Sequence, residues 1–185
     1  TGCHTIGMMR PLLSRNGQTG KVLKQWKGDR ASRIGRKFEE LAREILNNCK
    51  VLNVDPNVLT TISEIDFLIR KKPQANIFEF LKFSNGPILG EAKCYSGNGF
   101  SGDWVVKLIG RMSQQNINFA LLFVALKREK LQGKVKQNID IHAAQNKIII
   151  PIGYGVIEKL LAGENFLRLL DKHFNLVKTY APIPV

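Results

Sequence analysis

The stretch Glu91-Ala92-Lys93 carries the side chains best suited to chemistry in this sequence. It ends an apolar run, Pro87-Ile88-Leu89-Gly90, and side chains alternate faces along a strand, so Glu91 and Lys93 point the same way. A second acid, Asp66, follows Glu64-Ile65 in an earlier strand-like segment. Carboxylates can hold a divalent cation, and an ammonium beside them can position the water that such a cation activates. These are the groups that hydrolysis of a phosphodiester bond requires.

A helical pattern that begins at Arg33 and ends at Asn47-Asn48 offers a further acid. Its apolar residues recur at the spacing of one helical stripe: Ile34, Phe38, Leu41, Ala42, Ile45 and Leu46. Glu39 lies on the border of this stripe, so it can face a site across the sheet, whereas Glu40 and Glu44 are expected at the surface.

The segments between this helix and Lys93 read as strands. They lie at 50–54, 61–70, 76–83 and 87–94, and turn residues separate the last three, which predicts an antiparallel meander. Asp66 is preferred as the second acid of the site. Glu79, in the middle of the 76–83 segment, is the alternative.

The second half of the chain alternates helices with apolar strands. Asp103 is predicted as the N-cap of a helix over 104–115. The remaining elements are a strand at 119–125, a helix at 133–145, a strand at 147–152 and a helical stretch at 154–174 that breaks near Gly163-Glu164. This order predicts an α/β fold in one domain over 29–185, an α/β/α sandwich with a central mixed β-sheet.

The chain is strongly basic. Its 185 residues carry a formal net charge of +13, and the pI is about 9.9. Such an excess indicates a polyanionic partner, most commonly nucleic acid. Residues 1–28 contain no Asp or Glu and are interpreted as a basic N-terminal arm.

Several classes of protein are not expected. No apolar run is long enough for a transmembrane helix, and no secretory signal is visible. The three cysteines and three histidines lack the spacing of a zinc site. Scattered cysteines in an odd number favour a reducing cytoplasmic setting, and no association with a membrane is expected. Cys94 is expected to be a small buried apolar residue rather than a nucleophile.

The ordered set of these motifs resembles the PD-(D/E)XK nuclease superfamily. The helix with Gly35-Arg36-Lys37-Phe38-Glu39 is similar to its first motif, Glu64-Ile65-Asp66 to its second and Glu91-Ala92-Lys93 to its third. The segment Gly102–Met112 is similar to the matching region of Mrr-like restriction enzymes and archaeal Holliday-junction resolvases. The resemblance covers about residues 33–152. Ile65 stands where the family often has proline.

The resemblance implies a restriction-endonuclease-like fold and a Mg²⁺-dependent endodeoxyribonuclease that leaves a 5′-phosphate. Asp66, Glu91 and the backbone carbonyl of Ala92 would ligate Mg²⁺, for which Mn²⁺ would substitute. Lys93 would orient or deprotonate the attacking water, and Glu39 would hold a metal-bound water or a second cation. Relatives are often homodimers, because two sites cut two strands.

Basic residues outside the motifs are candidates for DNA contact. Lys107 and Arg111 are spaced i, i+4 on the face of the 104–115 helix that is expected to be exposed. A second basic cluster contains Lys127, Arg128, Lys130, Lys134 and Lys136. Two other functions remain open: a nucleic-acid-binding module that keeps the fold without cleavage, and a structural protein whose charge meets RNA.

Overall fold

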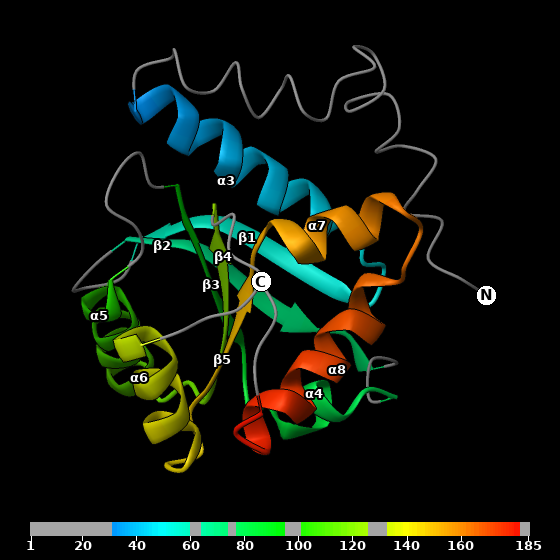
Figure 1. Cartoon of the computed structure of the whole chain (residues 1–185). Coiled ribbons are helices and arrows are strands. Elements are labelled where there is room, and N and C mark those ends of the chain that lie inside the picture. Colours follow the sequence, from blue (N-terminus) through cyan, green and yellow to red (C-terminus); the bar gives the residue numbers. More distant parts are fainter. Residues whose placement is uncertain (1–30, 60–63, 74–76, 95–100, 126–132, 182–185) are drawn as a thin grey trace.

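A five-stranded mixed sheet lies at the centre of the molecule (Figure 1). Its strands follow the order of the sequence: β1 (Leu52–Leu59), β2 (Glu64–Lys71), β3 (Ile88–Lys93), β4 (Phe119–Val124) and β5 (Ile148–Ile152). The first three form an antiparallel meander, and β3, β4 and β5 run parallel. The computed structural model describes residues 31–59, 64–73, 77–94, 101–125 and 133–181. The predicted arm at 1–28 lies outside them.

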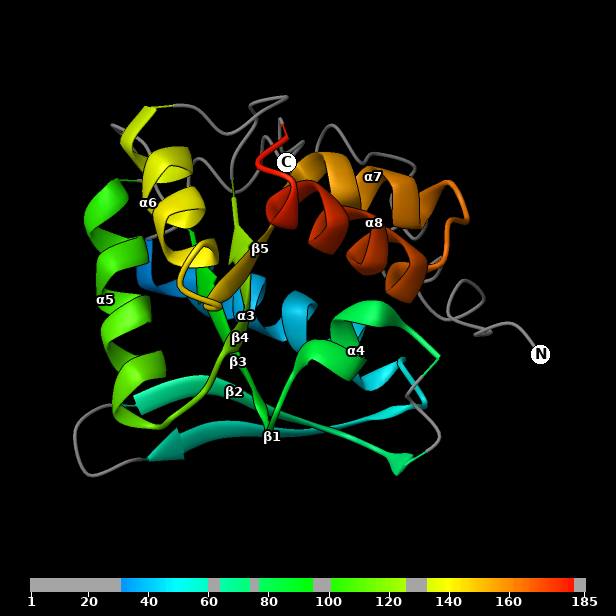
Figure 2. The same ribbon diagram turned by 90° about the horizontal axis from the view of Figure 1, so that it is seen from below.

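Helices cover both sides of this sheet. They are α3 (Ala31–Asn47), α4 (Glu79–Phe83), α5 (Gly102–Gln114), α6 (Gly133–Ala143), α7 (Tyr154–Leu161) and α8 (Phe166–Lys178). The pair α5 and α6 packs on one side of the parallel strands, and α4, α7 and α8 lie on the other (Figures 1 and 2). Helix α3 packs against β1 and β3. The predicted α/β sandwich with a mixed sheet is therefore confirmed.

The parallel strands are apolar because helices cover both of their faces. Every residue of β4 and β5 is buried. Aromatic rings fill the side that faces α4 and α8, where Phe119 contacts Phe80, Phe83 and Phe174. Among the described residues, no helix is long and apolar enough to cross a membrane.

The predicted strand at 76–83 is wrong, because part of this segment forms the short helix α4. Phe80 and Leu81 are adjacent and both fully buried, which one half-buried strand cannot achieve. Asp171 of α8 accepts a hydrogen bond from the Phe80 amide at 3.2 Å and thereby satisfies a free N–H of the first turn. This partner lies far away in the sequence, so local periodicity does not reveal it.

Two other boundaries differ from the prediction. The meander contains the hairpin of β1 and β2, since β1 extends beyond position 54 to Leu59 and carries Pro56, which an edge strand tolerates. The N-cap of α5 is Ser101 rather than Asp103. Asp103 lies in the first turn, where its charge suits the helix dipole. The predicted positions of α3, β4, α6, β5 and the break between α7 and α8 are confirmed.

Candidate active site

The register of β2 and β3 brings Asp66 and Glu91 together. Phe67 pairs with Gly90 at the end of this antiparallel ladder, so continuing the same register places Asp66 opposite Glu91. Residues opposite each other in a ladder share one face of the sheet. The Ala92 amide donates a hydrogen bond of 2.8 Å to Asp66 Oδ2, which fixes that carboxylate at β3. The two acids therefore lie side by side on the face that Lys93 also shares.

Lys93 joins the two carboxylates. Its Nζ lies 2.6 Å from Glu91 Oε1 and 3.6 Å from Asp66 Oδ2. Arg111 of α5 donates to the same oxygen, with 2.7 Å between Arg111 Nη1 and Glu91 Oε1. Three separate elements thus contribute to one cluster, the Glu91 cluster, which consists of Asp66, Glu91, Lys93 and Arg111.

Glu91 is almost completely buried, with 3% of its surface exposed. Burial of a carboxylate is costly unless cations and hydrogen bonds compensate it, and Lys93 and Arg111 do so at Oε1. The other oxygen, Oε2, is buried and has no hydrogen-bond partner. One acceptor in the middle of the cluster is therefore left unsatisfied.

Glu39 of α3 is half-buried and interacts electrostatically with the charges of this cluster. Partial burial raises the pKa of Glu39 above its ordinary value, the negative charge of Asp66 adds to this, and the positive charge of Lys93 opposes it. Its neighbour Glu40 is exposed, as the helical stripe predicts. Glu39 therefore faces the sheet near the two acids.

The carboxylates of the Glu91 cluster are candidates to hold a divalent cation. In the described part of the chain, no three or more His, Cys, Asp or Glu side chains are grouped closely enough to form a metal site by themselves. Asp66 and Glu91 nevertheless supply the hard oxygen donors that Mg²⁺ prefers. The buried, unpartnered Glu91 Oε2 is an acceptor that a cation would satisfy. On these two grounds the residues fit Mg²⁺.

The alternative acid, Glu79, does not belong to this cluster. It lies in the first turn of α4 and forms an ion pair of 2.8 Å with Lys82 on the surface.

Cys94 follows Lys93 and is half-buried. Burial raises the pKa of the Cys94 thiol, which disfavours the thiolate that a nucleophile needs.

The candidates for DNA contact lie in different environments. Lys107 is exposed, as predicted, and its Nζ lies 4.7 Å from the centre of the Trp104 ring. Arg111 is less exposed than predicted, because 25% of its side chain is accessible and its guanidinium pairs with the buried Glu91. Lys127, Arg128 and Lys130 lie outside the described residues. Lys134 is exposed, and Lys136 pairs with Asp140.

Sequence reasoning missed two neighbours of Lys93. The i, i+4 spacing of Arg111 from Lys107 predicts an exposed residue that contacts phosphate, and it does not reveal the contact with Glu91. Trp104 was not singled out, yet its ring centre lies 5.5 Å from Lys93 Nζ. Only the packing of α5 beside the end of β3 brings both residues to the cluster.

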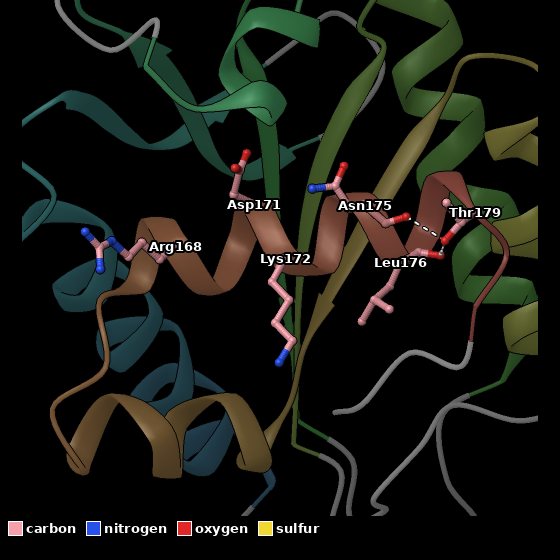
Figure 3. Close-up of a pocket in the computed structure, with 6 residues that line it drawn as sticks. All are labelled: Arg168, Asp171, Lys172, Asn175, Leu176 and Thr179. Carbon is pink, nitrogen blue, oxygen red and sulfur yellow. Dashed lines mark hydrogen bonds between the residues drawn. The ribbon is translucent and has the colours of Figure 1, made fainter.

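A separate groove of about 490 Å³ runs along α8 (Figure 3). Among the described residues, its lining comes from α8 and from Thr179, the C-cap that follows it: Arg168, Asp171, Lys172, Asn175, Leu176 and Thr179. Helix α8 packs on the side of the sheet opposite α5 (Figures 1 and 2). The groove is therefore distinct from the Glu91 cluster.

Comparison with known proteins identifies no family for this chain. No protein-family model matches it, and no curated protein matches it. A solved structure of SfsA from Pyrococcus furiosus, in complex with Ca²⁺, is similar at 15% sequence identity with a TM-score of 0.40. The match spans 66% of this chain and 57% of the SfsA chain. A likeness at this level carries no conclusion about function.

Proposed function

We propose that this chain is a Mg²⁺-dependent endodeoxyribonuclease with a restriction-endonuclease-like fold of the PD-(D/E)XK type. The observation that supports it best is the contact of Lys93 with both Asp66 and Glu91. The Glu91 carboxylate is buried, and its Oε2 has no hydrogen-bond partner. Such an arrangement is costly to maintain for stability alone, because an unsatisfied buried acceptor destabilises a fold. A bound cation would satisfy Glu91 Oε2, which would act as one of its ligands.

Each group has a distinct part in the proposed reaction. Asp66 and Glu91 would hold the cation, with the Ala92 carbonyl as a further oxygen ligand. When bound, Mg²⁺ supplies a Lewis acid that polarises a phosphoryl oxygen and makes a water molecule more acidic. The Lys93 ammonium would orient the attacking water and offset negative charge on the scissile phosphate. Glu39, whose pKa is raised, would accept a hydrogen bond or a proton from water.

DNA is the proposed partner. The net charge of +13 supports a polyanionic substrate. Lys107 is exposed on α5, the same helix that brings Arg111 to the cluster, so a backbone phosphate held there would lie near the cluster. Cleavage of both strands by a homodimer in a reducing cytoplasm, and Mn²⁺ as a substitute cation, remain predictions from the sequence.

The proposal is tested by incubating plasmid and single-stranded DNA with the purified protein in Mg²⁺, Mn²⁺ or EDTA. We expect nicked or linear products with either metal and none with EDTA. The variant Glu91→Gln should be inactive, because it lacks the charge that holds the cation. Wild-type protein that leaves every substrate intact with both metals would contradict the assignment.

A second function, a DNA-binding module without catalysis, is favoured by one observation. Lys93 and Arg111 already compensate Glu91 Oε1, as a purely structural ion-pair network would. In that case wild type and Glu91→Gln would bind the same DNA fragment and neither would cleave it. Cleavage by wild type alone excludes this function.

A further inference from the structure

One oxygen of Glu91 is shared by two cationic side chains. Lys93 Nζ lies 2.6 Å and Arg111 Nη1 lies 2.7 Å from Oε1, and Lys93 Nζ also lies 3.6 Å from Asp66 Oδ2. The Glu91 cluster therefore contains two formal negative and two formal positive charges in direct contact. The charges of Asp66 and Glu91 are therefore compensated within the cluster in the protein without DNA, and Glu39 is a further acid beside it.

This balance weakens the attraction of the cluster for a divalent cation. The carboxylates attract such a cation, but the ammonium and the guanidinium that contact Glu91 Oε1 repel it. Glu91 Oε2 has almost no contact with solvent, so a cation reaches it only when neighbouring side chains move. Weak cation binding in the absence of DNA follows from both features.

An anion from solvent can reach the two compensating cations. The side chains of Lys93 and Arg111 retain 22% and 25% of their exposure, against 4% for Glu91. A guanidinium binds phosphate through two parallel hydrogen bonds, which competes well with its single bond to Oε1. Arg111 also lies one helical turn from the exposed Lys107.

We propose that Arg111 restrains cation binding in the DNA-free protein and that a DNA phosphate relieves this restraint by drawing the guanidinium away from Glu91. The cation and DNA then bind cooperatively, and each increases the affinity for the other by the same factor. This inference rests on the proposed function, since it takes the Glu91 cluster as the cation site. Arg111 is thus a positioning residue, and Lys93 stays available for the reaction.

The test measures Mn²⁺ binding to the DNA-free protein by electron paramagnetic resonance. Five proteins are compared: wild type, Arg111→Met, Arg111→Gln, Arg111→Lys and Lys172→Met. Removal of one positive charge beside the carboxylates should tighten Mn²⁺ binding about tenfold in Arg111→Met. Arg111→Lys keeps the charge and should resemble wild type. Lys172→Met removes the same charge from the α8 groove on the other side of the sheet and should also resemble wild type.

A second measurement follows the coupling itself. Fluorescence anisotropy gives the affinity for a labelled duplex with and without Ca²⁺, which binds oxygen ligands as Mg²⁺ does. For wild type, Ca²⁺ should increase DNA affinity by about tenfold, a typical coupling between two sites. For Arg111→Met, the increase in DNA affinity caused by Ca²⁺ should be clearly smaller, because cation binding no longer requires a phosphate to displace the guanidinium.

The outcomes separate this inference from the proposed function. Unchanged or weaker Mn²⁺ binding in a folded Arg111→Met protein would overturn the restraint while the nuclease proposal stands. If wild type binds no cation with or without DNA, the nuclease proposal itself fails. Arg111→Gln, which keeps a neutral hydrogen-bond donor to Glu91, should show the same tightening as Arg111→Met. Unfolding of both variants would identify Arg111 as a structural partner and would also overturn the restraint.

Discussion

Lys93 is held in place by groups from three elements. Glu91 on its own strand, Asp66 on β2 and the Trp104 ring on α5 all lie near its ammonium. A lysine side chain is flexible and loses rotamer freedom when it is fixed, so several partners are needed to hold it in one position. The charged end remains partly exposed, with 22% of the side chain accessible. This combination suits a group that must meet a substrate in a defined geometry.

Replacement of Lys93 by Met should separate the fold from the reaction. Arg111 still compensates Glu91, so we expect the protein to fold with a loss of about 2 kcal/mol for the missing charged hydrogen bond. DNA cleavage should fall at least about a hundredfold, as when one charge-stabilising group of an active site is removed. Urea denaturation and a plasmid-nicking assay give the two quantities. Lys82→Met, at the surface pair on α4, is the control. Unfolding of Lys93→Met would mark the lysine as structural.

Glu39 should make the stability of the protein depend on pH. Its folded pKa is raised above the ordinary value of 4.5, so its contribution to stability is fully present below pH 4.5 and is lost as the pH rises through the raised pKa. Glu39→Gln removes this loss. We therefore expect the free energy of unfolding at pH 7 to rise by less than about 1 kcal/mol, since the group is partly exposed.

Below pH 4.5 the Glu39→Gln variant and wild type should be equally stable in urea denaturation. Glu40→Gln, at the exposed neighbouring position, should change neither value. A variant that is less stable than wild type at pH 7 would mean that Lys93 outweighs burial and holds Glu39 ionised. If the nuclease proposal is right, the stabilised variant should also cleave DNA more slowly.

At the scale of elements, the sequence predicts what local periodicity determines. Helix α3 and the buried strands β4 and β5 are long or uniform enough to be recognised, and the alternation in β3 places Glu91 and Lys93 on one face. Helix α4 escapes because its five residues pack through a distant partner, Asp171. The pairing of Arg111 with Glu91 depends on how α5 packs, which no local pattern encodes. The sequence therefore predicts Asp66, Glu91 and Lys93 as members of the site, but not the pairing of Arg111 with the Glu91 carboxylate.

The sheet near the cluster requires a residue without a side chain at Gly90. A Cβ atom there would lie 2.9 Å from Cβ and 3.0 Å from Cδ2 of Phe67, the residue opposite it in the ladder. The Phe67 ring uses this space to reach Phe123 across β3, with 6.4 Å between the ring centres. Gly90 therefore links the packing of three strands.

Gly90→Ala should destabilise the protein by about 1–3 kcal/mol, the usual cost of overpacking a core. Gly110→Ala is the matched control, because nothing lies within 4 Å of a Cβ at this exposed helical position. There alanine should stabilise by about 0.5–1 kcal/mol through its helix propensity. Urea denaturation monitored by circular dichroism measures both. Equal stability of Gly90→Ala and wild type would show that Phe67 moves without cost.

The molecule as a whole is strongly basic, yet the Glu91 carboxylate lies in its interior. The chain has 28 Lys and Arg against 15 Asp and Glu. The acids of the cluster nevertheless lie at the sheet, where Glu91 is hidden from solvent. Helices α5 and α8 lie on opposite sides of that sheet (Figures 1 and 2). Lys107 is exposed on α5, and Lys172 is exposed on α8. We therefore expect a duplex that binds at the cluster to contact Lys107 and not Lys172.

The salt dependence of DNA binding should distinguish these two lysines. Each neutralised phosphate contributes nearly one unit to the slope of log affinity against log salt. We therefore expect Lys107→Met to reduce that slope by about one and Lys172→Met to leave it unchanged. Fluorescence anisotropy with a labelled duplex, measured at several salt concentrations, gives the slopes. Equal slopes for both variants would mean that total charge alone attracts the DNA. A reduction only in Lys172→Met would place the duplex on the α8 side, away from the cluster, and the site proposed for cleavage would then be out of its reach.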